Sequence, residues 1–304
     1  MAHESDYLVD RRRLKRHLTF WRIVSVVSVV VAISLGYGGF KDTLGGREFI
    51  ARIAVEGVIV HDDDRIQEIR KLGDNDAVKA VIVRINSPGG TVVGGETLQK
   101  ALRSVGKKKP LVAVLDGIAT SAAYMTAIAT DRIFASEGTL TGSIGVIFQT
   151  TEITKLLEKV GVSAQSFKSG LLKAAPSPLE PVTPKIEIAI QALVTEMYQM
   201  FKDMVLRRRD MSLANVEKFS DGRVFTGRQA LQSGLVDQIG GEEEARNWLA
   251  EQKGVAADLE IRTVHLQPNT GGLPFQVKSL VRKAFLSEPL TLDGIISVWH
   301  PKLP

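Results

Sequence analysis

The chain of 304 residues contains no cysteine. That absence excludes disulfide bonds, thiolate metal ligands and a cysteine nucleophile. It does not decide the compartment, because a chain of this length can bury a core without covalent cross-links. Histidine is scarce too: there are five, and none lies near a serine in a sharp turn. We therefore expect no serine–histidine–aspartate triad, and we interpret His61, in the sequence His-Asp-Asp-Asp, as part of a solvated acidic turn rather than a metal site.

Several familiar motifs are also missing. The sequence has no G-x-S-x-G, no G-x-x-x-x-G-K-[ST], no G-x-G-x-x-G and no H-E-x-x-H. These absences argue against an α/β-hydrolase, a P-loop enzyme, a dinucleotide-binding enzyme and a zinc peptidase of that motif. Ser104 and Lys107 have a bare S-x-x-K spacing, but two further lysines and a proline follow, so we interpret them as an exposed turn. Nothing that remains implies a metal or a cofactor.

No excess of one charge runs through the chain. The net charge is +5, and residues 1–22 supply much of it, with six basic against three acidic side chains. The positive charge therefore belongs largely to this tail, and we do not expect nucleic-acid binding.

Residues 23–40 carry no charge, and their length is just sufficient to cross a bilayer. We expect a transmembrane anchor there, and the basic tail at 1–22 predicts a cytoplasmic N-terminal side. A linker at 41–47 would then lead to a domain across the membrane, which is the periplasm in a Gram-negative bacterium. A cleaved signal peptide, cut near Ala32-Ile33-Ser34, is the main alternative, and a buried soluble helix is a weaker one.

From residue 48 onward, short β-branched runs alternate with amphipathic stretches. This alternation predicts an α/β domain over 48–267 with βαβ crossovers. The predicted strands are Phe49–Val60, Ala80–Ile85, Pro110–Leu115, Asp131–Ser136, Val162–Phe167 and Leu259–Gln267. The predicted helices are Arg65–Leu72, Val92–Val105, Ser121–Ala129, Glu152–Val160, Lys185 to about Asp210, and a short one from Thr226 that Gly234 ends. Residues 268–304 form a C-terminal extension to which we assign no role.

Two turns follow neighbouring predicted strands. Asn86–Gly90 contains a proline and paired glycines, and Asp116–Tyr124 contains Ser121 among small residues. In an open α/β sheet, the carboxyl ends of the strands border the functional crevice. A serine beside two backbone N–H donors is the arrangement that acyl transfer needs. An ordinary strand-to-helix turn and a helix-capping serine are the simpler interpretations of the same residues.

Without a suitable histidine, a lysine has to act as the base. An ordinary lysine has a pKa of about 10.4, so a catalytic one must be desolvated to lose its proton near neutral pH. Lys168 and Lys173 both lie in one loop, in the sequence FKSGLLKAAPSP. Lys173 has apolar neighbours on both sides, which favours it over Lys168.

From about Glu48 to Gln252 the chain resembles the signal peptide peptidase A family of membrane-anchored serine peptidases. The resemblance rests on five segments in the family order: INSPGG (85–90), GIATSAAY (117–124), DRIFASEGTLTGSIGVI (131–147), FKSGLLKAAPSP (167–178) and FTGRQALQSGLVDQIGG (225–241). It implies a ClpP/crotonase-type fold, a superhelix of ββα units, and a serine–lysine dyad.

Carried over by position, the resemblance makes Ser121 the nucleophile and Lys173 the general base. It assigns the oxyanion donors to the N–H groups of Gly90 and Ala122, and it gives Ser143 a hydroxyl that orients the lysine. The family usually has two glycines after the serine, where this chain has two alanines. A donor N–H survives that change, but the groove is expected to be narrower.

The resemblance also implies partners. Members of the family form rings or domes, in which the dyad can be shared between subunits, so we expect a homo-oligomer. Their substrates are remnant signal peptides in the membrane, which bind in extended form with small or apolar side chains. A crotonase-like acyl-CoA enzyme and a catalytically silent membrane scaffold of the same fold are the alternatives to a peptidase.

Overall fold

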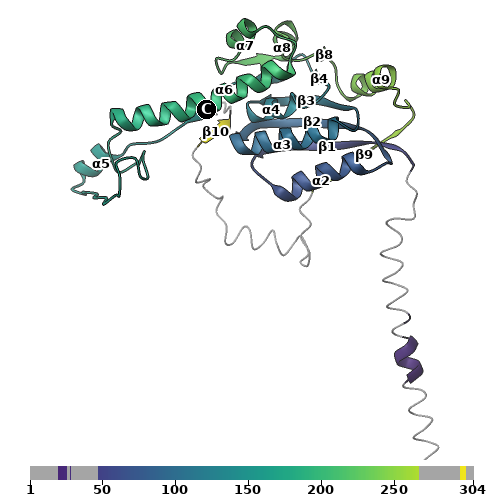
Figure 1. Ribbon diagram of the computed structural model, residues 1–304, viewed down its shortest axis with the longest axis horizontal. Coiled ribbons are helices and arrows are strands. Elements are labelled where there is room, and N and C mark those ends of the chain that lie inside the picture. The colour runs from purple at the N-terminus through teal and green to yellow at the C-terminus, as the bar shows by residue number, and fades with distance from the viewer. Residues whose placement is uncertain (1–19, 26–27, 29–46, 267–294, 299–304) are drawn as a thin grey trace, which may run out of the picture. The chain divides into compact units, whose positions relative to one another are not determined.

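Figure 1 shows the computed structural model of the chain, which describes residues 20–25, 28, 47–266 and 295–298. The chain divides into two compact units, 1–47 and 48–304. In the first unit, residues 20–25 and 28 are helical. Most of the predicted anchor at 23–40, and the tail up to residue 19, lie outside the described residues. Within the described ranges, no helix is both long enough and apolar enough to cross a bilayer.

The second unit is built on a sheet whose main part is parallel. Each strand of this main part pairs in parallel with the next one. Its strands, in spatial order, are β9 (Glu260–Thr263), β1 (Phe49–Ile59), β2 (Val78–Thr91), β3 (Leu111–Thr120), β4 (Arg132–Ala135) and β8 (Gln238–Ile239). Residues 80–83 of β2 and 111–115 of β3 are continuously buried runs, as expected for strands that are covered on both faces. The predicted α/β class is confirmed.

Helices cover both faces of this sheet. The connections β1–β2 and β2–β3 contain α2 (Asp63–Asp74) and α3 (Val92–Gly106). Each begins at a side-chain cap: Asp62 accepts from the N–H of Arg65, and Thr91 from that of Gly94, both at 3.0 Å. Together with α4 (Ala122–Ala127), they pack on one face of the sheet. The opposite face is covered by α9 (Glu242–Lys253).

The strands β2 and β3 extend beyond the predicted runs, and their extra residues form a second set of pairings. The end of β3 pairs with β5 (Leu140–Gly142), which pairs in antiparallel fashion with β7 (Val224–Thr226). The end of β2 pairs antiparallel with β10 (Ile295–Val298), which also pairs with β6 (Ile147–Phe148). The sheet is therefore mixed. The sequence indicated only the parallel crossovers, because these later strands are too short to show a period of their own.

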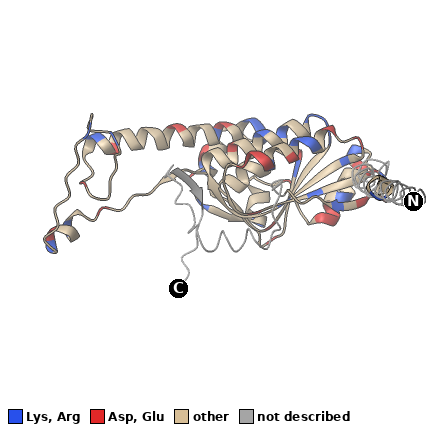
Figure 2. Cartoon of the chain, turned by 90° about the horizontal axis from the view of Figure 1, so that it is seen from below, with Lys and Arg blue, Asp and Glu red and all other residues tan. Residues whose placement is uncertain are grey.

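An arm made of residues 149–183 separates β6 from α6 (Pro184–Arg208). It contains one short helix, α5 (Thr154–Lys159). Figure 2 shows α6 as a long helix that leaves the body of the sheet and leads to the arm. The predicted strand Val162–Phe167 is wrong: the structure has no strand there, and Phe167 is 97% exposed. Among the described residues no other strand pairs with it, so its backbone groups have no ladder to join there.

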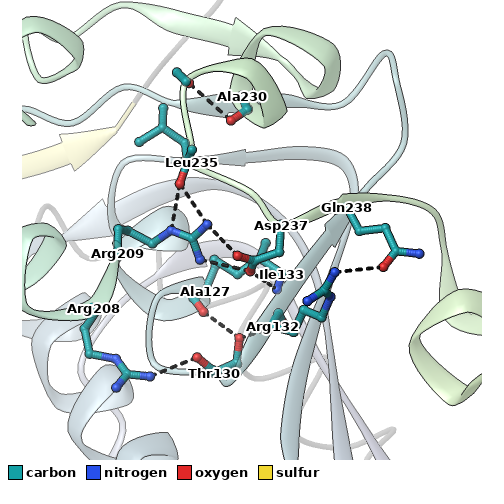
Figure 3. Close-up of polar contacts among 12 residues, drawn as sticks. Ala127, Thr130, Arg132, Ile133, Arg208, Arg209, Ala230, Leu235, Asp237 and Gln238 are labelled. Carbon is teal, nitrogen blue, oxygen red and sulfur yellow. Dashed lines mark hydrogen bonds and ion pairs between the residues drawn. The ribbon is translucent and has the colours of Figure 1, made fainter. Parts of the chain in front are cut away.

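Two arginines at the end of α6 fasten this helix to the body (Figure 3). Arg208 donates to the carbonyl oxygens of Ile128 and Thr130 at 2.8 and 2.9 Å, just beyond the end of α4. Arg209 makes a two-pronged ion pair with Asp237, at 2.9 and 2.8 Å, and also donates to the carbonyl of Gly234. The helix that leads to the arm is thus joined directly to the helix that follows Ser121.

The segment that contains Gly234 and Asp237 also contacts α4 itself. Tyr124 is fully buried, and its hydroxyl donates to the carbonyl of Leu235 at 2.8 Å. Burial raises the pKa of the Tyr124 phenol, so it stays neutral and keeps this hydrogen bond. The remaining helices, α7 (Leu213–Phe219) and α8 (Gly227–Gln232), complete this end of the body.

We expect Arg209→Leu to lower the free energy of unfolding by about 3 kcal/mol, because it removes one partner of an ion pair whose arginine side chain is only 9% exposed. The measurement is urea denaturation of the full chain in detergent. Arg207→Leu, on the neighbouring exposed position of α6, is the matched control and should change stability by less than about 0.5 kcal/mol. Equal effects of the two substitutions would contradict the anchoring role of Arg209.

Candidate active site

Ser121 lies at the junction between β3 and α4. Its N–H donates to the carbonyl of Gly142 at 2.8 Å, and its carbonyl accepts from the N–H of Met125 at 2.9 Å. The side chain is 1% exposed and makes no capping hydrogen bond to α4. Its backbone has φ 58° and ψ −119°, a conformation that L-residues rarely adopt. The helix-capping interpretation of this serine is therefore wrong, and its strained backbone is typical of a functional site.

Ser143 lies beside Ser121 because of the strand register. Thr120 pairs with Gly142 in the parallel ladder between β3 and β5, so the next residue on each strand is a serine. Ser143 donates its N–H to the carbonyl of Arg223 at 2.8 Å, is 8% exposed and has φ 49°. The structure thus brings the two predicted serines to adjacent strand ends.

Gly90 lies near the end of β2, next to the end of β3. Ser87 pairs with Ala119, and the Thr120 hydroxyl donates to the carbonyl of Pro88 at 3.0 Å, which joins the two strand ends. A Cβ atom on Gly90 would lie 1.8 Å from the carbonyl oxygen of Ile59. No other residue fits at position 90 without moving β1, because the obstacle is backbone.

Ala122 begins α4 and is fully buried. The ideal Cβ position of Gly95, in α3, lies only 2.9 Å from the Cβ of Ala122. The two helices therefore approach each other where one residue has no side chain. Glycine inside a helix costs about 1 kcal/mol of stability relative to alanine, so a glycine pair there indicates a packing reason. Gly94-Gly95 was therefore a sequence signal for this close approach, and the sequence analysis did not use it. Gly95 thus provides the space that the side chain of Ala122 occupies.

Lys173 is not brought to Ser121 within one chain. It lies in a turn of the arm, its side chain is exposed, and it makes no side-chain hydrogen bond or ion pair with the described residues. Ser121, in contrast, is buried in the body. Ala174, the residue after this lysine, has φ 56°. In the described part of the chain, the non-glycine residues with positive φ are Ser121, Ser143 and Ala174.

Lys168 has a different environment from Lys173. Its ammonium pairs with the carboxylate of Glu180, and its side chain is only 16% exposed. The hydrogen bond from Lys168, followed by one from Ser166, lowers the pKa of Glu180. The Lys168 amine is thus already engaged by a carboxylate of the arm itself. Lys168 therefore fits a role in shaping the arm, whereas the amine of Lys173 has no hydrogen-bond or ion-pair partner among the described residues.

Residues 103–256, about half of the chain, match the sequence profile of peptidase family S49. A protein of Synechocystis sp. named putative protease slr0021 is 39% identical over 220 residues, which cover 72% of this chain and 79% of that protein.

A protein of Enterococcus faecium named putative signal peptide peptidase SppA is 36% identical over 189 residues, covering 62% of this chain and 55% of that protein. Among solved structures, ClpP1 from Listeria monocytogenes aligns over 64% of this chain and 92% of its own, with a TM-score of 0.42 and 16% identity.

Proposed function

The chain belongs to peptidase family S49, and from this premise we propose that it is a serine endopeptidase with a Ser121–Lys173 dyad and a ClpP/crotonase-type fold. The observation that carries the proposal is the backbone of Ser121: a buried serine with positive φ, between a strand and a helix, that does not cap the helix. Such strain persists only where the surrounding structure imposes it.

The proposed reaction has two stages. Neutral Lys173 takes the proton of the Ser121 hydroxyl as its oxygen attacks the peptide carbonyl, and the N–H groups of Gly90 and Ala122 stabilise the oxyanion. The lysine then gives that proton to the leaving amine, which breaks the peptide bond and leaves an ester on Ser121. Water, deprotonated by Lys173, hydrolyses the ester and regenerates the serine. Ser143 positions the lysine amine.

The proposed dyad forms between copies of the chain. Lys173 is exposed on the arm, whereas Ser121 is buried in the body, so a neighbouring copy has to present the lysine. The arm and the helix after it also expose an unusual amount of apolar surface, which marks an interaction site. The exposed apolar side chains of residues 149–193 are Leu156, Val160, Val162, Phe167, Leu171, Leu172, Leu179, Val182, Ile188 and Leu193. A second copy would bury them and desolvate Lys173 at the same time, which supplies the condition for a neutral lysine.

We further propose that the peptidase domain at 48–267 is held at the bacterial inner membrane by an anchor at 23–40 and faces the extracytoplasmic side. The charge-free run and the basic residues before it support this arrangement. Substrates would be apolar peptides in extended form, with remnant signal peptides as the natural class. The relative from Enterococcus faecium bears the name of such a peptidase.

A fluorophosphonate probe tests the serine chemistry directly. We expect it to label one residue, Ser121, in the detergent-solubilised full chain, and we expect Lys173→Ala to reduce the labelling at least about 100-fold because the hydroxyl loses its base. Lys168→Ala is the matched control from the same loop and should retain labelling. Peptide mass spectrometry locates the label. A label on another serine, or full labelling of Lys173→Ala, would refute the dyad.

A further inference from the structure

The first turn of α3 connects the two N–H groups that we assign to the oxyanion. The helix begins two residues after Gly90, and its N-cap Thr91 accepts a hydrogen bond from the N–H of Gly94 at 3.0 Å. In the same turn, Gly95 faces Ala122, which is the first residue of α4. The chain therefore leads from one proposed donor to the other through a single capped helical turn and a close contact between two helices.

The contact at Gly95 leaves no room for a larger residue. A Cβ atom on Gly95 would lie 2.9 Å from the Cβ of Ala122, 3.3 Å from its Cα and 3.0 Å from the Sδ of Met125. The methionine sulfur belongs to a flexible side chain that can turn away, whereas the Cβ of Ala122 moves only when the backbone of α4 moves. Ala122 and Met125 are both fully buried, so a close-packed core surrounds this contact.

A second side of the same turn lies against the end of β1. A Cβ atom on Gly94 would lie 2.8 Å from the carbonyl oxygen of Ile59 and 2.8 Å from the carbonyl carbon of Val60. The same oxygen of Ile59 lies against Gly90, at 1.8 Å from the position of its missing Cβ. Because backbone supports the turn on this side, we expect a side chain at position 95 to displace α4 rather than α3.

We propose that Gly95 is a positioning residue for the oxyanion site, and that the contact between positions 95 and 122 sets the separation of the two donor N–H groups. The inference rests on the proposed function, which gives Gly90 and Ala122 their donor roles. Gly95 itself touches no reacting atom and acts only through Ala122. Its size affects how well the oxyanion is held, and it does not affect the lysine that moves the proton.

A displaced donor weakens the transition state more than the bound substrate. Oxyanion donors point to the position where charge develops, and removal of one donor lowers kcat by about 100- to 1,000-fold. A methyl group at position 95 would have to widen the 2.9 Å separation to 3.4 Å or more to reach an ordinary contact. Such a shift misaligns the donor without removing it, so we expect a smaller loss, about 30-fold in kcat.

Gly95→Ala in the full chain tests this role. In detergent, with an apolar peptide as substrate, we expect kcat to fall about 30-fold at constant KM, because the lost interaction belongs to the transition state. The pH dependence of kcat should keep its wild-type midpoint, since the lysine is untouched. Gly106→Ala, in the last turn of α3, is the matched control: the nearest atom to its Cβ would lie at 3.5 Å, and its kcat and KM should match those of the wild type.

A compensating substitution should restore much of the lost activity. Ala122→Gly removes the methyl group that Gly95→Ala would meet, and it keeps the N–H that serves as the donor. We therefore expect the double variant to have a kcat at least about tenfold higher than that of Gly95→Ala alone. A general loss of stability would give the opposite result, because two unfavourable changes in one buried contact would add.

A variant at the cap of α3 keeps the inference testable if Gly95→Ala fails to assemble, which gel filtration reports. Thr91→Val removes the oxygen that accepts from the N–H of Gly94, whereas Thr91→Ser retains an acceptor there. If this turn sets the spacing of the donors, Thr91→Val lowers kcat about fivefold at constant KM, and Thr91→Ser restores the wild-type value.

The outcomes separate this inference from the peptidase proposal. Wild-type kcat in an assembled Gly95→Ala or Thr91→Val chain would overturn the inference alone, and so would a double variant that is no faster than Gly95→Ala. A raised KM at constant kcat would also overturn it, since the effect would then lie in substrate binding. A wild-type chain that hydrolyses no peptide and takes no serine label would instead overturn the peptidase proposal, and the donor role of this contact with it.

Discussion

Replacing Ser121 with alanine is expected to lower kcat/KM for peptide hydrolysis by at least about 1,000-fold, because it removes the proposed nucleophile that forms the acyl-enzyme. The measurement is cleavage of an apolar peptide by the detergent-solubilised chain, followed by mass spectrometry. Assembly should be unaffected, since the lost oxygen belongs to a small buried side chain.

Two controls make the result specific. Ser104→Ala removes a hydroxyl that donates to the carbonyl of Ala101 in α3, and it should retain wild-type activity. Gel filtration should give the same particle size for Ser121→Ala and the wild type. Substantial hydrolysis by a correctly assembled Ser121→Ala chain would remove the serine from the mechanism.

Mixing two inactive variants is expected to restore activity. Ser121→Ala supplies an intact lysine and Lys173→Ala supplies an intact serine. In a head-to-tail ring each site would draw its serine from one copy and its lysine from the next, so random mixing in equal amounts leaves both groups intact in about one quarter of the sites. We therefore expect about a quarter of the wild-type kcat from two preparations that are each inactive.

The mixed sample must be assembled together, by coexpression or by dissociation and reassembly. Mixing Ser121→Ala with a double variant, Ser121→Ala and Lys173→Ala, is the control and should stay inactive because neither chain carries the serine. An inactive mixture of the two single variants in demonstrably mixed particles would place the dyad within one chain and refute sharing.

The sequence predicts the parallel core well. The buried runs in β2 and β3 are local signals, and the structure has α2 and α3 close to their predicted bounds, whereas β2 and β3 continue beyond the predicted runs. The position of Ser121 at a strand end also follows from the sequence, since the strand and the small residues after it are visible there.

Other features depend on contacts between distant segments. The proximity of Ser121 and Ser143 comes from the β3–β5 register, and Ile147–Phe148 is a strand only because β10 pairs with it. The segment Val162–Phe167 shows the opposite case: its residues favour a strand, yet no strand in the described part of the chain pairs with it. Strand propensity reports how well the residues of a segment suit a β-sheet, but it does not report whether a partner strand is present.

Because the arm keeps the proposed base in solvent, the activity of the protein would depend on the local concentration of its copies. A newly made polypeptide would be dormant, because its nucleophile and base meet only when copies gather. The total peptidase activity would then rise more steeply than in proportion to the local concentration of the chain, and dilution would abolish it. Crowding in two dimensions, as on a lipid sheet, would suit such a molecule, since it brings copies together while the surrounding compartment stays free of stray cleavage.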